Sequence, residues 1–299
     1  MERLYNLALL SVAGSLIAAV YASAKLAGSA GLGPLGLLAW QLGAASLILG
    51  GICLANGTWP RLDPERLRYL ALAGMLGVSG PNLVTFHVLQ DLPAGVVGVV
   101  AALSPLFSYL IVIVLRQEAP KLGAILALLA GFIGVAWALW PAGKPLYPLG
   151  AAMAAVLAPL LLAAANVYRS FAWPEGLAPL PAAAVTLLLQ AIVIVPIAAL
   201  RGQLPDESAF ATAAVPLGVA ALGSAAFFLA TFRLQRRAGA VITGQLGYVI
   251  TLASLAIGAV LFEERPSAEM AWAVLLVVGS VLSLTLSRAT PAPHARAEQ

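Results

Sequence analysis

The sequence has few charged residues and a single cysteine. Charged residues make up 9% of its 299 residues and hydrophobic ones 62%, whereas an average soluble domain carries about 25% charged residues. The mean hydropathy is +0.98. A soluble domain of this length cannot bury so much apolar surface, so the composition indicates a chain surrounded by lipid. The lone Cys53 excludes an intramolecular disulfide. The net charge of +4 is too small and too scattered for a nucleic-acid-binding surface.

The long apolar runs contain no aspartate and a single glutamate, Glu269, which is the first residue of the last run. A buried carboxylate is a common proton relay in ion-coupled pumps, and metal cations need anionic oxygen ligands. We therefore expect no metal site and no cofactor. A membrane-embedded enzyme is disfavoured as well, because there are no paired carboxylates and only His87 lies within a run. Coupling through His87, or through a carboxylate at the end of a run, stays open.

Apolar runs of about 20 residues, each long enough to span a membrane as a helix, fill almost the whole sequence. Short segments rich in glycine, proline or charge separate them. The predicted fold is an all-α integral membrane protein with ten transmembrane helices, near residues 5–27, 34–55, 67–89, 94–116, 121–140, 146–171, 179–201, 208–232, 240–262 and 269–288.

The second half of the sequence repeats the first half weakly at one offset. Adding 146 to each number places Thr85-Phe86 on Thr231-Phe232, Ala94 on Ala240, Glu118 on Glu264 and Pro120 on Pro266. The shared offset predicts two five-helix repeats. We place them at residues 1–143 and 144–288, followed by a disordered cytoplasmic tail at 289–299.

The distribution of lysine and arginine predicts the orientation. With the N-terminus inside, 12 of the 16 basic residues fall on the cytoplasmic side and 4 on the other. The positive-inside rule therefore places both termini in the cytoplasm. Each repeat has five spans, an odd number, so the second repeat begins on the opposite side of the membrane from the first. The two repeats must therefore be inverted relative to each other. Inverted repeats are typical of alternating-access transporters. A channel remains the alternative, since some channels also have such repeats.

Two segments resemble a known family. AGVVGVVAALSPLFSYLIVIVLRQEAP (94–120), followed by Gly131 and Gly134, and AGAVITGQLGYVITLASLAIGAVLFEERP (238–266) resemble the EamA-type halves of the drug/metabolite transporter superfamily. The sequence departs from that pattern at Gln117 and Glu263, where the family usually has glycine. It also departs at Thr251, the position in the second half that corresponds to Pro105 in the first.

The resemblance implies a central cavity between the repeats and export of amino acids or similar metabolites from the bacterial cytoplasm. Within the superfamily the overall sequence is most similar to aromatic amino acid exporters. The implied setting is the bacterial inner membrane, with a small-molecule substrate, the lipid bilayer and no obligatory protein partner. A broad drug/metabolite exporter is the alternative.

Polar, aromatic and helix-breaking residues inside the runs are the candidates for a substrate path. Ser79-Gly80-Pro81-Asn82 and Ser104-Pro105 predict either broken helices that face a cavity or ordinary packed kinks. The candidates are Tyr21, Ser79, Pro81, Asn82, His87, Ser104, Pro105, Asn166, Phe227, Gln245 and Tyr248. Trp40, Phe86, Tyr109 and Phe228 are further candidates for apolar walls.

Two cations lie near the ends of corresponding runs. Lys25 and Arg169 are gate or carboxylate-steering candidates, although long cations at helix ends often only extend toward the membrane surface. The small residues Gly95, Gly98, Ala102, Gly131 and Gly134 predict close helix packing rather than a site.

Overall fold

The structure is a computed structural model that describes residues 2–140, 147–264 and 268–289. All regular secondary structure in these ranges is helical, which confirms the predicted all-α fold. The loop predicted at 141–145 and most of the predicted tail at 289–299 lie outside the described residues. The helices are α1 (Glu2–Ser29), α2 (Pro34–Ala55), α3 (Pro64–Gly74), η1 (Met75–Ser79), α4 (Gly80–Val88), α5 (Ala94–Ala101), α6 (Ser104–Val114), α7 (Leu122–Leu139), α8 (Leu149–Ala172), α9 (Pro179–Leu200), α10 (Glu207–Gly244), α11 (Leu246–Leu261) and α12 (Ala268–Ala289).

Eight segments of the described chain are long and apolar enough to cross a membrane. They correspond to the first eight predicted runs. Two shorter apolar helices, Leu246–Leu261 and Met270–Ser280, occupy the places of the ninth and tenth. The third run consists of α3, η1 and α4, and the fourth of α5 and α6.

Two of these segments are interrupted at the predicted positions. The third contains the π-helical turn η1, which ends directly before Gly80 and Pro81. Proline has no N–H to donate, and π turns commonly accompany such breaks. A Cβ on Gly80 would lie 2.7 Å from the Met75 carbonyl oxygen, so this turn requires glycine. In the fourth segment, α5 ends at Ala101 and α6 begins at Ser104, directly before Pro105.

The break predicted at residues 233–239 is wrong. Helix α10 continues through these residues to Gly244, and α11 starts at Leu246 rather than at 240, after a turn at Gln245. Arginine, leucine, glutamine and alanine all favour helices, and a single glycine is tolerated. A cluster of positive charge marks where the chain meets polar surroundings, but it does not end a helix.

Helices α6 and α11 end in the same way. Arg116 and Glu263, each two residues past the end of its helix, have positive φ angles of 57° and 52°. This left-handed conformation commonly closes a helix and favours glycine. Glu263 is one of the two positions where the resembled family usually has glycine, so the side chain there carries a modest backbone strain.

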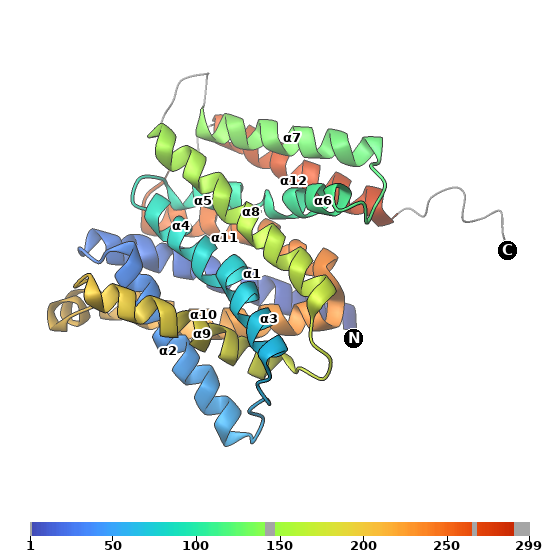
Figure 1. Ribbon diagram of the computed structural model, residues 1–299. Helices are drawn as coiled ribbons and strands as arrows, with labels where there is room; N and C mark the ends of the chain where they lie inside the picture. Colours follow the sequence, from blue (N-terminus) through green and yellow to red (C-terminus); the bar gives the residue numbers. More distant parts are fainter. Residues whose placement is uncertain (1, 141–146, 265–267, 290–299) are drawn as a thin grey trace.

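The helices pack in pairs drawn from the two halves of the chain. Helix α7 lies beside α12 at one edge of the bundle, and α2 beside α9 at the opposite edge (Figure 1). Between these edges α1 packs on α10 and α11, while α8 packs on α4 and α6. The centre of the bundle is therefore built from helices of both halves of the chain.

Small residues allow the close approach that the sequence predicts. A Cβ on Gly98 would lie 2.6 Å from Ser254 Cβ, and one on Gly134 would lie 2.8 Å from Val277 Cγ2. Neither site has room for a larger side chain without movement of a neighbouring helix.

The outer surface of the bundle is apolar. Large hydrophobic side chains are more than two-thirds exposed on several helices, among them Leu47, Val114, Leu122, Val215 and Val260. A water-soluble protein rarely exposes so much contiguous apolar surface. These side chains instead suit a surface in contact with lipid.

Candidate functional site

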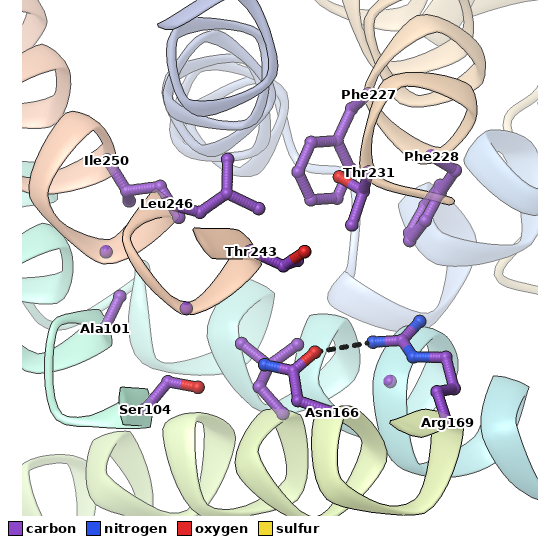
Figure 2. A pocket seen from close by; sticks show the side chains of 14 residues that line it. Ala101, Ser104, Asn166, Arg169, Phe227, Phe228, Thr231, Thr243, Leu246 and Ile250 are labelled. Carbon is purple, nitrogen blue, oxygen red and sulfur yellow. Dashed lines mark hydrogen bonds between the residues drawn. The ribbon is translucent and has the colours of Figure 1, made fainter. Parts of the chain in front are cut away.

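A cavity of about 50 Å³, partly open to the outside, lies among the central helices. Helices α8, α10 and α11 form most of its wall, and η1, α5 and α6 complete it (Figure 2). Its lining residues are Gly77, Ala101, Ser104, Leu162, Asn166, Arg169, Phe227, Phe228, Thr231, Thr243, Gly244, Leu246, Gly247 and Ile250.

Each interrupted helix borders this cavity. Gly77 belongs to the π turn, Ala101 and Ser104 flank the break between α5 and α6, and Gly244 and Leu246 flank the turn at Gln245. Irregular backbone is tolerated at membrane depth where it lines a cavity or is buried in protein. The sequence features that break these helices therefore also build the cavity.

Among the described residues that line the cavity, Arg169 alone has a charged side chain. The residue is 3% exposed, its Nη2 donates a hydrogen bond of 3.0 Å to Asn166 Oδ1, and its guanidinium lies 5.3 Å from the centre of the Phe232 ring. Gly77 makes room for it, because a Cβ there would lie 3.2 Å from Arg169 Nη2. Arg169 therefore does not extend toward the membrane surface, which was the alternative to a role as a gate or carboxylate-steering residue, because packing of α8 against η1 and α10 buries it.

The structure brings four of the predicted candidates together. Ser104, Asn166, Phe227 and Arg169 all line the cavity. Figure 2 shows Asn166 and Arg169 on α8 facing the side chains of Phe227, Phe228 and Thr231 on α10. Phe228 was a wall candidate and also lines the cavity.

Several candidates lie outside the cavity lining. Ser79 Oγ lies 2.6 Å from Gln190 Oε1, and Gln190 Nε2 donates to the Ala71 carbonyl, so this group links η1 to α9. Asn82 is buried, and its Nδ2 has no hydrogen-bond partner in the described chain. His87 is exposed near the end of α4. The remaining ones, absent from the lining, are Tyr21, Pro81, Pro105, Gln245 and Tyr248.

Sequence reasoning did not select Thr231 and Thr243, which also line the cavity. A threonine hydroxyl in a helix commonly bonds to a carbonyl of the preceding turn, so these residues look ordinary in a membrane span. For Thr231 a signal did exist, because Thr231-Phe232 is one of the dipeptides repeated between the halves.

Lys25, near the end of α1, is not among the residues that line the cavity. Its Nζ is 2.5 Å from Glu264 Oε1 and 4.5 Å from the centre of the Phe262 ring. The same carboxylate accepts hydrogen bonds from the backbone N–H groups of Ala94 and Gly95. Lys25 thus joins the end of α1 to the segment after α11 and to the start of α5.

The helical bundle and its apolar outer surface define a multi-pass membrane protein. Residues 6–140 match the model of the EamA-like transporter family.

Two known proteins are similar to the chain. Protein PecM of Dickeya dadantii (strain 3937) is 26% identical over 214 residues, which cover 71% of this chain and 72% of PecM. A solved crystal structure superposes with a TM-score of 0.64 at 21% identity, over 93% of this chain and 98% of the other. At this identity the structural match supports the fold alone.

Proposed function

We propose that the protein exports small metabolites across a bacterial inner membrane by alternating access between two inverted five-helix repeats. Its substrates include amino acids with neutral or aromatic side chains, or related compounds. The repeats are residues 1–143 and 144–288, and both termini lie in the cytoplasm. The central observation is that one partly open cavity is lined by residues from both repeats.

The packing of the helices supports the paired repeats. Helix α1, the first of one repeat, packs on α10 and α11, and α8, the first of the other, packs on the equivalent segments α4 and α6. The two-fold axis proposed between the repeats would relate these contacts, and it would make α2–α9 and α7–α12 pairs of equivalent helices. Arg116 and Glu263, with their similar positive φ angles, end equivalent helices.

The cavity suits a small, mostly apolar solute. Its wall combines phenylalanine and aliphatic side chains with a few polar groups from Ser104, Asn166, Thr231 and Thr243. Small-molecule sites commonly enclose about 300–1,000 Å³. This cavity measures about 50 Å³, so the helices around it must move apart to admit a whole substrate. None of the lining residues is acidic, so the wall supplies no carboxylate relay. We expect transport without an obligatory carboxylate-linked proton.

Counterflow in liposomes tests this function. Purified protein is reconstituted in liposomes loaded with unlabelled phenylalanine, tryptophan or threonine, and uptake of the labelled compound is followed without an imposed gradient. We expect saturable exchange by the native protein and none by Thr231→Trp, which fills the cavity. The matched control Leu222→Trp places the same side chain at an outward-facing position on α10 that is 66% exposed, and it should keep full exchange.

The other results have distinct meanings. Non-saturable flux with single-channel conductance would establish a channel instead. If a folded, monodisperse protein exchanges none of these amino acids but exchanges other small metabolites, the amino-acid assignment is wrong and the broader exporter assignment stands.

A further inference from the structure

We propose that the cavity selects organic acids: solutes with one carboxylate and an apolar or aromatic body, in preference to zwitterions with the same body. Arg169 binds the carboxylate, and Phe227 and Phe228 contact the body. Among the substrates proposed above, this inference places carboxylate anions related to amino acids ahead of the zwitterionic amino acids themselves, and it rests on the proposed transport function.

The described wall of the cavity carries one positive charge, on Arg169. Arg169 is 3% exposed and is the one charged residue among those that line the cavity. The ion pairs found in the described chain are Lys25–Glu264 and Arg66–Asp63, and neither includes Arg169. Its polar partner Asn166 supplies a neutral oxygen. A buried cation without a paired anion is unfavourable, and it marks a functional site by default at membrane depth.

The second argument is the hydrogen-bonding capacity left at the site. A guanidinium has five N–H donors in a planar fork that fits a carboxylate through two parallel bonds. Nη2 of Arg169 donates to Asn166, whereas Nε has no partner in the described chain. Thr231 Oγ1, on the facing helix, is also buried and without a partner there. A carboxylate bound in the cavity would give the Arg169 guanidinium an acceptor of opposite charge, and the Thr231 hydroxyl is a further donor in the same wall.

The third argument is the shape of the remaining wall. The rings of Phe227 and Phe228 lie 4.9 Å apart in an edge-to-face arrangement at 62°, and Leu162 and Ile250 add aliphatic surface. An ammonium group on the solute would find hydroxyl and amide oxygens in this wall but no carboxylate, and Arg169 would repel it. The expected order of affinity is therefore anion, then zwitterion, then cation.

Three compounds with the same benzyl side chain test this order. N-acetylphenylalanine is an anion, phenylalanine a zwitterion and phenylalaninamide, in its protonated form, a cation. Binding is measured as ligand-induced thermal stabilisation of the purified protein, and transport is measured as counterflow in liposomes. We expect the native protein to bind N-acetylphenylalanine most tightly.

Asn166→Asp is the decisive variant because it is nearly isosteric and supplies Arg169 with an internal carboxylate at the position of the present 3.0 Å hydrogen bond. We expect the affinity for N-acetylphenylalanine to fall about 10- to 100-fold, the change expected for loss of a charged hydrogen bond. The affinity for phenylalanine should fall less, and that for phenylalaninamide should rise. Arg233→Gln, at an exposed arginine on α10, is the control and should leave all three affinities unchanged.

The two readouts separate this inference from the transport function. Equal affinities for the three compounds, unchanged by Asn166→Asp, would overturn the organic-acid inference even if counterflow is saturable. That result would also mean that Arg169 has a structural role only, in which it packs α8 against the Phe232 ring. Preferred binding of the anion without counterflow of any compound would support the site while overturning the transport function.

Discussion

Lys25 and Glu264 connect the two halves of the chain at one end of the bundle. Nζ of Lys25 lies 2.5 Å from Oε1 of Glu264, and the two side chains are 27% and 18% exposed. The Glu264 carboxylate also accepts N–H groups of Ala94 at 2.9 Å and Gly95 at 3.1 Å. It thus lies at the N-terminus of α5, where the helix dipole favours negative charge. One carboxylate therefore links α1, α5 and the segment after α11.

This arrangement predicts that exchanging the two charges does not restore the link. Lys25→Met and Glu264→Gln should each weaken it, with a coupling free energy of about 1 kcal/mol in a double-mutant cycle. The exchanged pair Lys25→Glu/Glu264→Lys should remain destabilised, because a lysine at 264 cannot accept the two backbone N–H groups. Thermal unfolding in detergent and counterflow rates measure the effect.

A full recovery of stability by the exchanged pair would mean that the ion pair alone matters. The local pair formed by Arg66 and Asp63, at 3.4 Å and with side chains 27% and 50% exposed, is the control, and replacing Arg66 by glutamine should leave counterflow unchanged.

The contact between α5 and α11 predicts a second, steric effect. A Cβ on Gly98 would lie 2.6 Å from Ser254 Cβ, and Thr251 Oγ1 lies 2.9 Å from the Gly98 carbonyl oxygen. We expect Gly98→Ala to destabilise the protein by about 1–3 kcal/mol through overpacking. Gly218→Ala on α10 is the matched control, because nothing lies within 4 Å of its added Cβ, and alanine should be neutral or stabilising there. Equal melting temperatures for the two variants would contradict the close helix contact.

The sequence alone was sufficient to predict the helical membrane fold and the interruptions near Pro81 and Pro105. These features depend on local properties, namely apolar length and the missing N–H of proline. The end of α10 was not predictable in this way, because the residues that mark the polar boundary also favour a helix.

Part of the site was predictable for the same local reasons. Ser104 and Asn166 stand out because polar groups are rare in apolar spans. The burial of Arg169 was not predictable, since it depends on the space that Gly77 leaves on a distant segment. A position near the end of a helix indicates a snorkelling cation unless the tertiary contacts are known.

The start of α10 predicts a local dependence on pH. Ser208 Oγ and the Ala209 N–H donate to Asp206 Oδ1, and these bonds lower the pKa of the Asp206 carboxyl below its ordinary value. A lowered pKa means that the charged cap stabilises the first turn above the unfolded pKa of about 3.9. That contribution is lost as the pH falls through the lower folded value.

Hydrogen exchange of the first turn of α10 measures this cap. Asp206→Ala should exchange faster than the native protein at neutral pH. Asp206→Asn, which keeps a capping oxygen, should stay close to the native protein and lack the pH dependence. Identical exchange in all three proteins would show that the cap does not stabilise the turn.

The orientation of the chain in the membrane can be tested with two pairs of loops, because the two loops of each pair must lie on the same side. A Cβ on Gly33 would lie 3.8 Å from Gln203 Cδ, so the loops after α1 and α9 share one face. The loops before α3 and after α8 share a face as well, because Arg66 Nη2 donates to the Glu175 carbonyl at 3.1 Å. Single cysteines are placed at exposed positions in a Cys53→Ser background: Ser29 and Leu204 on the first face, Arg61 and Glu175 on the second.

With both termini in the cytoplasm, a membrane-impermeant maleimide added to intact bacterial cells should label Ser29→Cys and Leu204→Cys. Arg61→Cys and Glu175→Cys should react only after the membrane is permeabilised. The reverse pattern would keep the fold but contradict the orientation that the distribution of lysine and arginine predicts. If intact cells label one cysteine of a pair and not the other, the loop contacts themselves are contradicted, because neighbouring loops cannot lie on opposite sides of a membrane.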